Sequence, residues 1–168
     1  MNQAKMKESP AVQLEAPRFE NGKPLVIAGL RSRYTGKTMN SIPAQWGRFA
    51  PHIGKIPGQV GPAAYGACWN FADGIDYLTG VEISSSSSLP GDFSVVTIPA
   101  QKYAVFPHRE HVSKLRETLE AIDKWLRGSG LEAASGSAET PSFFERYSEE
   151  FDPRTGMGGM EVWIPIKS

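Results

Sequence analysis

The feature that most constrains the fold is an order of periodicities that occurs twice along the chain. In each half, a strand-like stretch is followed by apolar positions at helical spacing and then by two more strand-like stretches. The first unit covers about residues 24–84 and the second about residues 92–168. The pattern is duplicated, but the residues are not. Two such units can pair their sheets, so the sequence predicts one α+β domain with pseudo-twofold symmetry, a mainly antiparallel sheet and a central groove.

The first unit opens with residues 25–34, whose apolar and then alternating pattern predicts a strand. A helix centred on Trp46 is expected next, followed by strands over residues 63–71 and 75–84. Asp73-Gly74 between these strands predicts a tight hairpin, because both residues tolerate positive φ.

The second unit begins with extended chain over residues 93–106, which is broken at Pro99. An amphipathic stripe over residues 112–126 predicts a helix. Strands over residues 143–151 and 160–166 complete the unit.

Two segments are expected to lie outside the repeated units. Residues 1–23 are polar and show no sustained period, which predicts a partly ordered N-terminal arm. Folded structure should therefore begin near Pro24 and extend over residues 24–168. The serines of residues 84–88, followed by Pro90-Gly91, are typical of a connector between the halves.

The composition argues against several classes of function. The 18 Lys and Arg balance the 18 Asp and Glu, so no net charge draws the chain to DNA or to an acidic membrane. Cys68 is the single cysteine, and the three histidines have no metal-ligand spacing, so no metal site is expected. No segment matches a nucleotide-binding loop, so no cofactor is expected either. Without a signal peptide or an apolar stretch of ~20 residues, the expected location is the cytoplasm.

A carboxylate lies between aromatic residues in the strand-like stretch FFERY. Side chains alternate along a strand, so Phe143, Glu145 and Tyr147 should share one face. In a pocket, burial would raise the pKa of Glu145, whereas a cationic ligand would favour its ionised form. This arrangement suits cation recognition or acid–base chemistry. The strand pattern alone leaves a second reading open, a glutamate that faces solvent.

Further aromatic residues are candidate walls for a flat apolar ligand. Tyr65 and Trp69 share one face of their strand, and Tyr77 lies on the next strand. Most aromatic residues at such spacings pack in the core, which is the alternative for Trp46 above all. The candidate ligand-binding residues are Glu145, Tyr147, Phe143, Tyr65, Trp69, Tyr77, Phe106 and Trp46, with Glu145 also the candidate catalytic residue.

The second unit resembles the GyrI-like small-molecule-binding family, which also occurs as the effector-binding domain of AraC-type and MerR-type multidrug regulators. The similar segments are IPAQKYAVFPH, IDKWLRGSG, FFERY and MEVWIPI, which begin at residues 98, 122, 143 and 160. The first unit is similar more loosely, so the resemblance covers nearly all of residues 24–168. It implies two strand-helix-strand-strand (SHS2) modules around a hydrophobic groove, with Glu145 as the glutamate that contacts cationic ligands.

Three functions follow from this resemblance. The first is a stand-alone module that senses or sequesters hydrophobic or cationic small molecules through aromatic contacts and Glu145. The second is a hydrolase of cyclopropane-containing cytotoxins, in which Glu145 would orient a water molecule. The third is a DNA gyrase inhibitor-like protein, with gyrase or a regulator protein as its partner. The arm before Pro24 is too short for a DNA-binding domain, so direct DNA binding is not expected.

Overall fold

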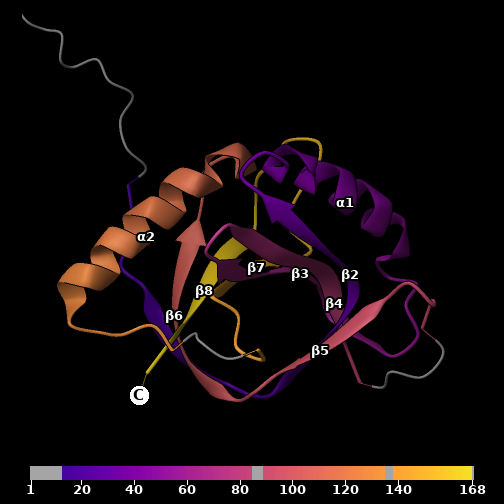
Figure 1. The fold of residues 1–168 in the computed structure, drawn as a ribbon, viewed down its shortest axis with the longest axis horizontal. Coiled ribbons are helices and arrows are strands. Elements are labelled where there is room, and N and C mark those ends of the chain that lie inside the picture. The colour runs from indigo at the N-terminus through magenta and orange to yellow at the C-terminus, as the bar shows by residue number, and fades with distance from the viewer. Residues whose placement is uncertain (1–12, 85–88, 135–137, 168) are drawn as a thin grey trace, which may run out of the picture.

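The computed structural model describes residues 13–84, 89–134 and 138–167. It has an α+β fold, as the sequence predicts, and both strand-helix-strand-strand units are present (Figure 1). Three-residue 3₁₀ turns precede both helices, and another follows α1. The elements are β1 (Arg18–Gly22), β2 (Leu25–Thr35), α1 (Ile42–Phe49), β3 (Gln59–Phe71), β4 (Gly74–Ile83), β5 (Ser94–Ile98), β6 (Gln101–His108), α2 (Leu115–Ser129), β7 (Phe143–Tyr147) and β8 (Met160–Ile166).

One sheet contains all eight strands, in the order β1-β6-β8-β7-β3-β4-β2-β5. Every pairing between these strands is antiparallel. The two units meet where β7 pairs with β3, and the order outward from this pair is equivalent in each half. Both helices lie on the same face of the sheet, which curls away beneath them (Figure 1). The predicted pseudo-twofold arrangement is therefore confirmed.

The sheet curls because β1 continues into β2, β5 continues into β6, and these two extended segments pair with each other across the ends of the sheet. The chain passes from β1 directly into β2 and from β5 directly into β6, with two residues between the strands in each case. The pairs β1·β6 and β2·β5 keep one register, which aligns Pro24 with Pro99 at the interruption. Proline has no N–H to donate to a ladder, so it is tolerated where pairing is broken. The result is one antiparallel ribbon that joins the two ends of the sheet.

The curled sheet has a separate core on each face. On the concave side, the rings of Tyr103, Phe144 and Trp163 contact one another with centroids 5.2 to 5.4 Å apart. On the other face, α2 covers a cluster around Phe106 and α1 covers a cluster around Phe49. The face that carries the helices is called the helix face below.

Folded structure begins earlier than the expected boundary at Pro24. Arg18–Gly22 forms β1 within the segment expected to be an arm, and it pairs with β6. Most of its side chains are exposed, so no apolar period marks the strand in the sequence. Backbone pairing to an existing sheet edge, rather than burial, makes this segment a strand.

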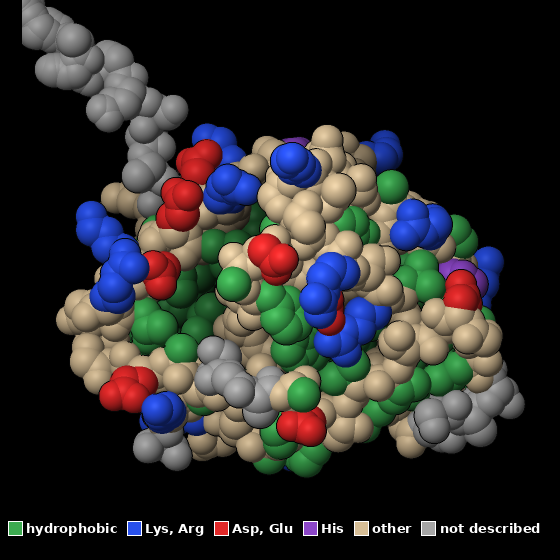
Figure 2. All heavy atoms as spheres, in the orientation of Figure 1, with side chains coloured by type: hydrophobic (Ala, Val, Ile, Leu, Met, Phe, Trp, Pro, Cys, Tyr) green, Lys and Arg blue, Asp and Glu red, His purple; other side chains and the backbone are tan. Residues whose placement is uncertain are grey.

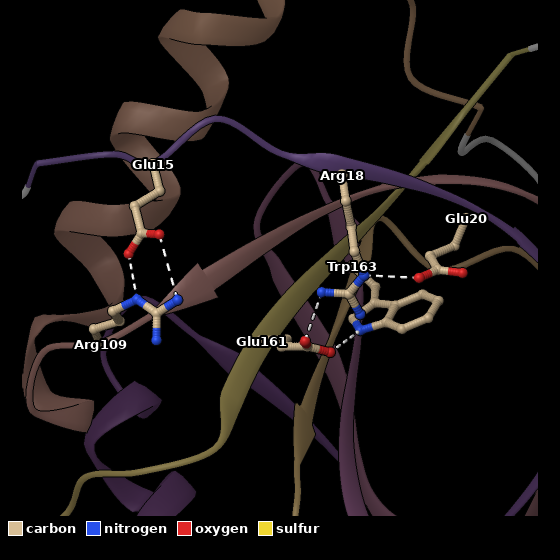
Figure 3. A network of polar contacts seen from close by, with 6 residues as sticks. All are labelled: Glu15, Arg18, Glu20, Arg109, Glu161 and Trp163. Carbon is tan, nitrogen blue, oxygen red and sulfur yellow. Dashed lines mark hydrogen bonds and ion pairs between the residues drawn. The ribbon is translucent and has the colours of Figure 1, made fainter.

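Charged side chains also connect this N-terminal segment to the sheet (Figure 3). Arg18 donates to Glu161 of β8 at 2.8 Å and to Glu20 at 2.7 Å, and Glu15 pairs with Arg109. Most of these side chains are exposed, and exposed ion pairs contribute little to stability. The backbone ladder with β6 therefore remains the main attachment.

One expected strand is shorter in the structure, and most of one expected connector lies outside the described residues. The strand expected over residues 143–151 ends at Tyr147. Ser148 starts a turn there, because its hydroxyl accepts from the N–H of Glu150 and its carbonyl accepts from the N–H of Phe151. Most of the serine connector, residues 85–88, lies outside the described residues.

Among the residues that the structure describes, no helix is long and apolar enough to cross a membrane. The same residues also contain no group of three or more His, Cys, Asp or Glu side chains placed to hold a metal ion.

A buried polar side chain attaches α1 to the sheet. Gln45 is fully buried, and its side-chain carbonyl accepts from the hydroxyl of Tyr34 at 2.5 Å. Its amide group donates to the carbonyls of Leu30 and Tyr77, at 2.8 and 3.1 Å. These bonds reach two strands at once, so they determine where the neighbouring Trp46 lies over the sheet.

We expect Gln45→Leu to lower the free energy of unfolding by about 1–3 kcal/mol, because the buried hydroxyl of Tyr34 loses its acceptor. Tyr34→Phe removes the same bond from the other side and should cost about 1 kcal/mol. In urea denaturation, the double variant should lose less than the sum of the single losses. Strict additivity would show that the two side chains do not interact.

Candidate functional site

Glu145 lies on the helix face at the junction of the two halves. It is 3% exposed and pairs across the β7·β3 junction with Gly66. Phe143 and Tyr147 pack with residues under the helices, whereas Phe144 belongs to the concave core. The alternation predicted for this strand is therefore confirmed, and the alternative of a solvent-facing Glu145 is wrong.

Two tyrosine hydroxyls donate to the same oxygen of this carboxyl group. Tyr77 from β4 and Tyr147 from β7 each donate to Oε1 of Glu145 at 2.7 Å. Trp46 from α1 donates its indole N–H to the hydroxyl of Tyr77 at 3.0 Å. Its ring also meets the ring of Tyr147 edge-on, with centroids 5.2 Å apart. Within the described residues, no group donates to Oε2, so one oxygen carries all the hydrogen bonds.

The space for this cluster depends on a glycine from the other half. A Cβ atom on Gly66 would lie 2.2 Å from the hydroxyl oxygen of Tyr77 and 2.7 Å from Oε1 of Glu145. No side chain can occupy that position without displacing the hydrogen bonds. One half of the pseudo-symmetric domain therefore supplies the carboxyl group, and the equivalent strand of the other half leaves room for it.

Burial controls the ionisation of the cluster. Loss of hydration raises the pKa of Glu145 to about 7, although the hydrogen bonds from Tyr77 and Tyr147 act in the opposite direction. Burial, and then the nearby carboxylate, raises the pKa of both tyrosines. Both hydroxyls therefore stay protonated donors, while Glu145 changes charge near neutral pH. A carboxyl group in this state can pair with a cation or accept a proton.

Tyr65 and Trp69 do not join this cluster. The β3·β7 register places Gly66, not Tyr65, opposite Glu145, and successive side chains on a strand point to opposite faces. Both aromatic residues consequently lie in the concave core. Neither residue therefore forms a wall beside Glu145, because the sequence shows the alternation within β3 but not its register against β7. Trp69 instead lines a separate cavity.

The other candidate residues lie on the helix face at different places. Trp46 and Tyr77 contact each other and surround the carboxyl group. Phe106 is also on this face, but it lies beneath α2 with its ring 5.3 Å from that of Trp125. Phe143 is half-buried between these two regions. The sequence did not identify Gly66 as a site residue, because a glycine within a strand indicates that another group packs closely against it without showing which group.

A cavity of about 820 Å³ opens on the α2 side of Phe143. Leu119 and Ile122 of α2 form one wall, and Ile164 of β8 contributes another. Figure 2 shows hydrophobic side chains in a hollow beneath α2. Glu145 is not part of the lining. The helix face therefore has a closed polar cluster at its centre, and an open, mainly apolar cavity lies beside it and also reaches Trp69 of the concave core.

The raised pKa of Glu145 should appear in the pH dependence of stability. A carboxyl group that holds its proton longer in the folded state stabilises the fold fully below pH 4.5 and loses this contribution as pH rises through about 7. The full loss corresponds to roughly 3 kcal/mol.

In urea denaturation between pH 4.5 and 8, the wild type should therefore lose stability relative to Glu145→Gln, which cannot ionise. Glu132→Gln, which changes an exposed carboxylate paired with Lys167, is the control and should follow the wild type. Parallel pH profiles for wild type and Glu145→Gln would contradict the raised pKa.

Comparison with known proteins places this geometry in a family. Residues 15–167 match the model of the GyrI-like small molecule binding domain. The transcriptional regulator BrlR of Pseudomonas aeruginosa is 30% identical over 130 residues, which are 76% of this chain and 47% of the regulator. The chain thus spans about half the length of BrlR.

Solved structures with low sequence identity share the fold. The structure of SAV2435 bound to tetraphenylphosphonium has a TM-score of 0.72 at 19% identity, covering 92% of this chain and 95% of the other. A putative transcription regulation protein from Staphylococcus aureus MU50 has a TM-score of 0.66 at 20% identity, covering 90% and 98%. The family match extends over nearly the whole chain and agrees with the fold, so this chain belongs to the GyrI-like small molecule binding domain family.

Proposed function

We propose that this chain binds hydrophobic cations on the helix face, with Glu145 as their charge partner, and so senses or sequesters them. The burial and hydrogen bonding of Glu145 are the observations that support this proposal. Its carboxyl group is buried, both hydroxyl donors occupy Oε1, and Oε2 accepts no hydrogen bond from the described residues. Hydrogen bonds replace only part of the hydration that a buried carboxylate loses, so an approaching cation stabilises its charged form.

The aromatic residues around this carboxyl group support the same ligand class. The rings of Trp46, Tyr77 and Tyr147 contact one another beside Glu145. Aromatic faces attract cations and provide apolar contact area. A ligand that is both hydrophobic and positively charged uses both properties. SAV2435, which shares the fold, was solved with such a compound, tetraphenylphosphonium.

Neighbouring aromatic side chains restrict access to the carboxyl group of Glu145. Glu145 and Tyr147 are buried, and Trp46 from α1 covers them. Phe143 separates the cluster from the cavity beneath α2. Displacement of the half-buried Trp46 or Phe143 would expose the carboxyl group without breaking the hydrogen bonds to Oε1.

We expect Glu145→Gln to weaken tetraphenylphosphonium binding by roughly 10- to 100-fold, because it removes a Coulomb attraction of about 2 kcal/mol, as expected for charges ~8 Å apart at an effective dielectric constant of ~20. Triphenylphosphine oxide, a neutral compound with similar rings, should lose less than threefold. Isothermal titration calorimetry measures both affinities.

The same titration at several pH values adds a second readout. Cation affinity of the wild type should rise from pH 5.5 to 8, because Glu145 ionises with a pKa of about 7. Glu145→Gln should show no such rise, whereas Glu132→Gln should behave as the wild type. Equal weakening of the cation and the neutral compound would exclude Glu145 as the charge partner.

The raised pKa also favours a second candidate, hydrolysis of strained cyclopropane-containing compounds. A general base works best with a pKa near the operating pH, and that of Glu145 is about 7. If the chain is such an enzyme, mass spectrometry should detect a ring-opened product one water heavier, and Glu145→Gln should abolish it. Recovery of unchanged compound from a saturable complex would favour binding alone. The gyrase hypothesis concerns another surface and stays a prediction.

A further inference from the structure

We infer that the cavity beneath α2 is a second binding site, which takes an uncharged apolar small molecule. This site is distinct from the Glu145 cluster in its walls and in the chemistry that it recognises. Its volume of about 820 Å³ falls within the roughly 300–1,000 Å³ typical of small-molecule sites.

The walls of the cavity are mainly apolar side chains from several elements. Leu119, Ile122 and Leu126 line it from α2, and they repeat at helical spacing so that one stripe of the helix faces inward. Phe143 of β7 and Ile164 of β8 line it from the sheet. An apolar ligand that buries this surface is stabilised in proportion to the area removed from water.

The charged side chains at the cavity already have partners. Arg31 pairs with Asp76 at 3.1 Å, and Asp123 pairs with Arg127 at 2.6 Å. A charged ligand would have to compete with these intramolecular partners, whereas a neutral one leaves them intact.

Most of the polar groups of the sheet at this cavity are engaged, but the buried indole N–H of Trp69, which lines it, has no hydrogen-bond partner among the described residues. The hydroxyl of Ser142 accepts from the backbone N–H of Asn70 at 3.1 Å. The guanidinium of Arg31 lies over the ring of Trp69, 4.3 Å from its centroid. The lining thus favours apolar contact over a charge or a dense set of hydrogen bonds, in contrast to the Glu145 cluster.

Titration with N-phenyl-1-naphthylamine, an uncharged dye whose fluorescence rises in apolar surroundings, tests this site. Ala133 is exposed and lines the cavity, so Ala133→Phe fills space without opening the core. We expect Ala133→Phe to lower the affinity for the dye at least tenfold. Ala100→Phe makes the same change at an exposed position between β5 and β6 that lines neither site, and it should stay within twofold of the wild type.

Glu145→Gln separates this inference from the proposed function. Its dye affinity should stay within twofold of the wild type, and Ala133→Phe should keep its affinity for tetraphenylphosphonium within threefold. Ala138→Phe, at another exposed position on the lining, repeats the filling test if Ala133→Phe does not fold.

Three results would contradict the proposal of a second site. They are the absence of dye binding to the wild type, dye binding that both filling variants leave unchanged, and a loss in Glu145→Gln as large as that in Ala133→Phe. The last result would mean that the dye occupies the Glu145 site.

Discussion

The antiparallel ribbon that connects the two ends of the sheet is the constraint on which the rest of the structure depends. Because β1–β2 and β5–β6 keep one register across Pro24 and Pro99, the sheet must curl until its ends meet. Curling gives the sheet a concave side, filled by aromatic side chains, and an outer side, on which both helices pack. It also brings the two units together at β7·β3, so the middle of the helix face is built from both halves.

Glu145 shows what this junction makes possible. A carboxyl group at an ordinary sheet surface would be hydrated, but here helices and aromatic side chains exclude water from it. The two tyrosine hydroxyls offset only part of the lost hydration, so its pKa remains raised. The fold therefore keeps a destabilising group at its centre. Strongly perturbed carboxyl groups cluster at functional sites, which supports the role proposed for Glu145.

The halves share an arrangement but differ in how their helices pack. α1 has 8 residues and is held close to the sheet by the hydrogen bonds of Gln45, with Trp46 against the tyrosines. α2 has 15 residues, and its apolar stripe borders a cavity that extends to Phe143. Pseudo-symmetry thus places a polar, closed region and an apolar, open region side by side on one face.

The sequence by itself determined what depends on local pattern. Periodicity indicated both units, the order of their strands and helices, and the shared face of Phe143, Glu145 and Tyr147. Four segments of the second unit, FFERY among them, together pointed to the family. Tertiary structure alone decided what depends on pairing between distant segments. The β3·β7 register set Gly66 opposite Glu145 and turned Tyr65 and Trp69 to the other face, since a shift of one residue reverses every side chain. Likewise, β1 is a strand because the edge of β6 is available to it, and no local pattern records that edge.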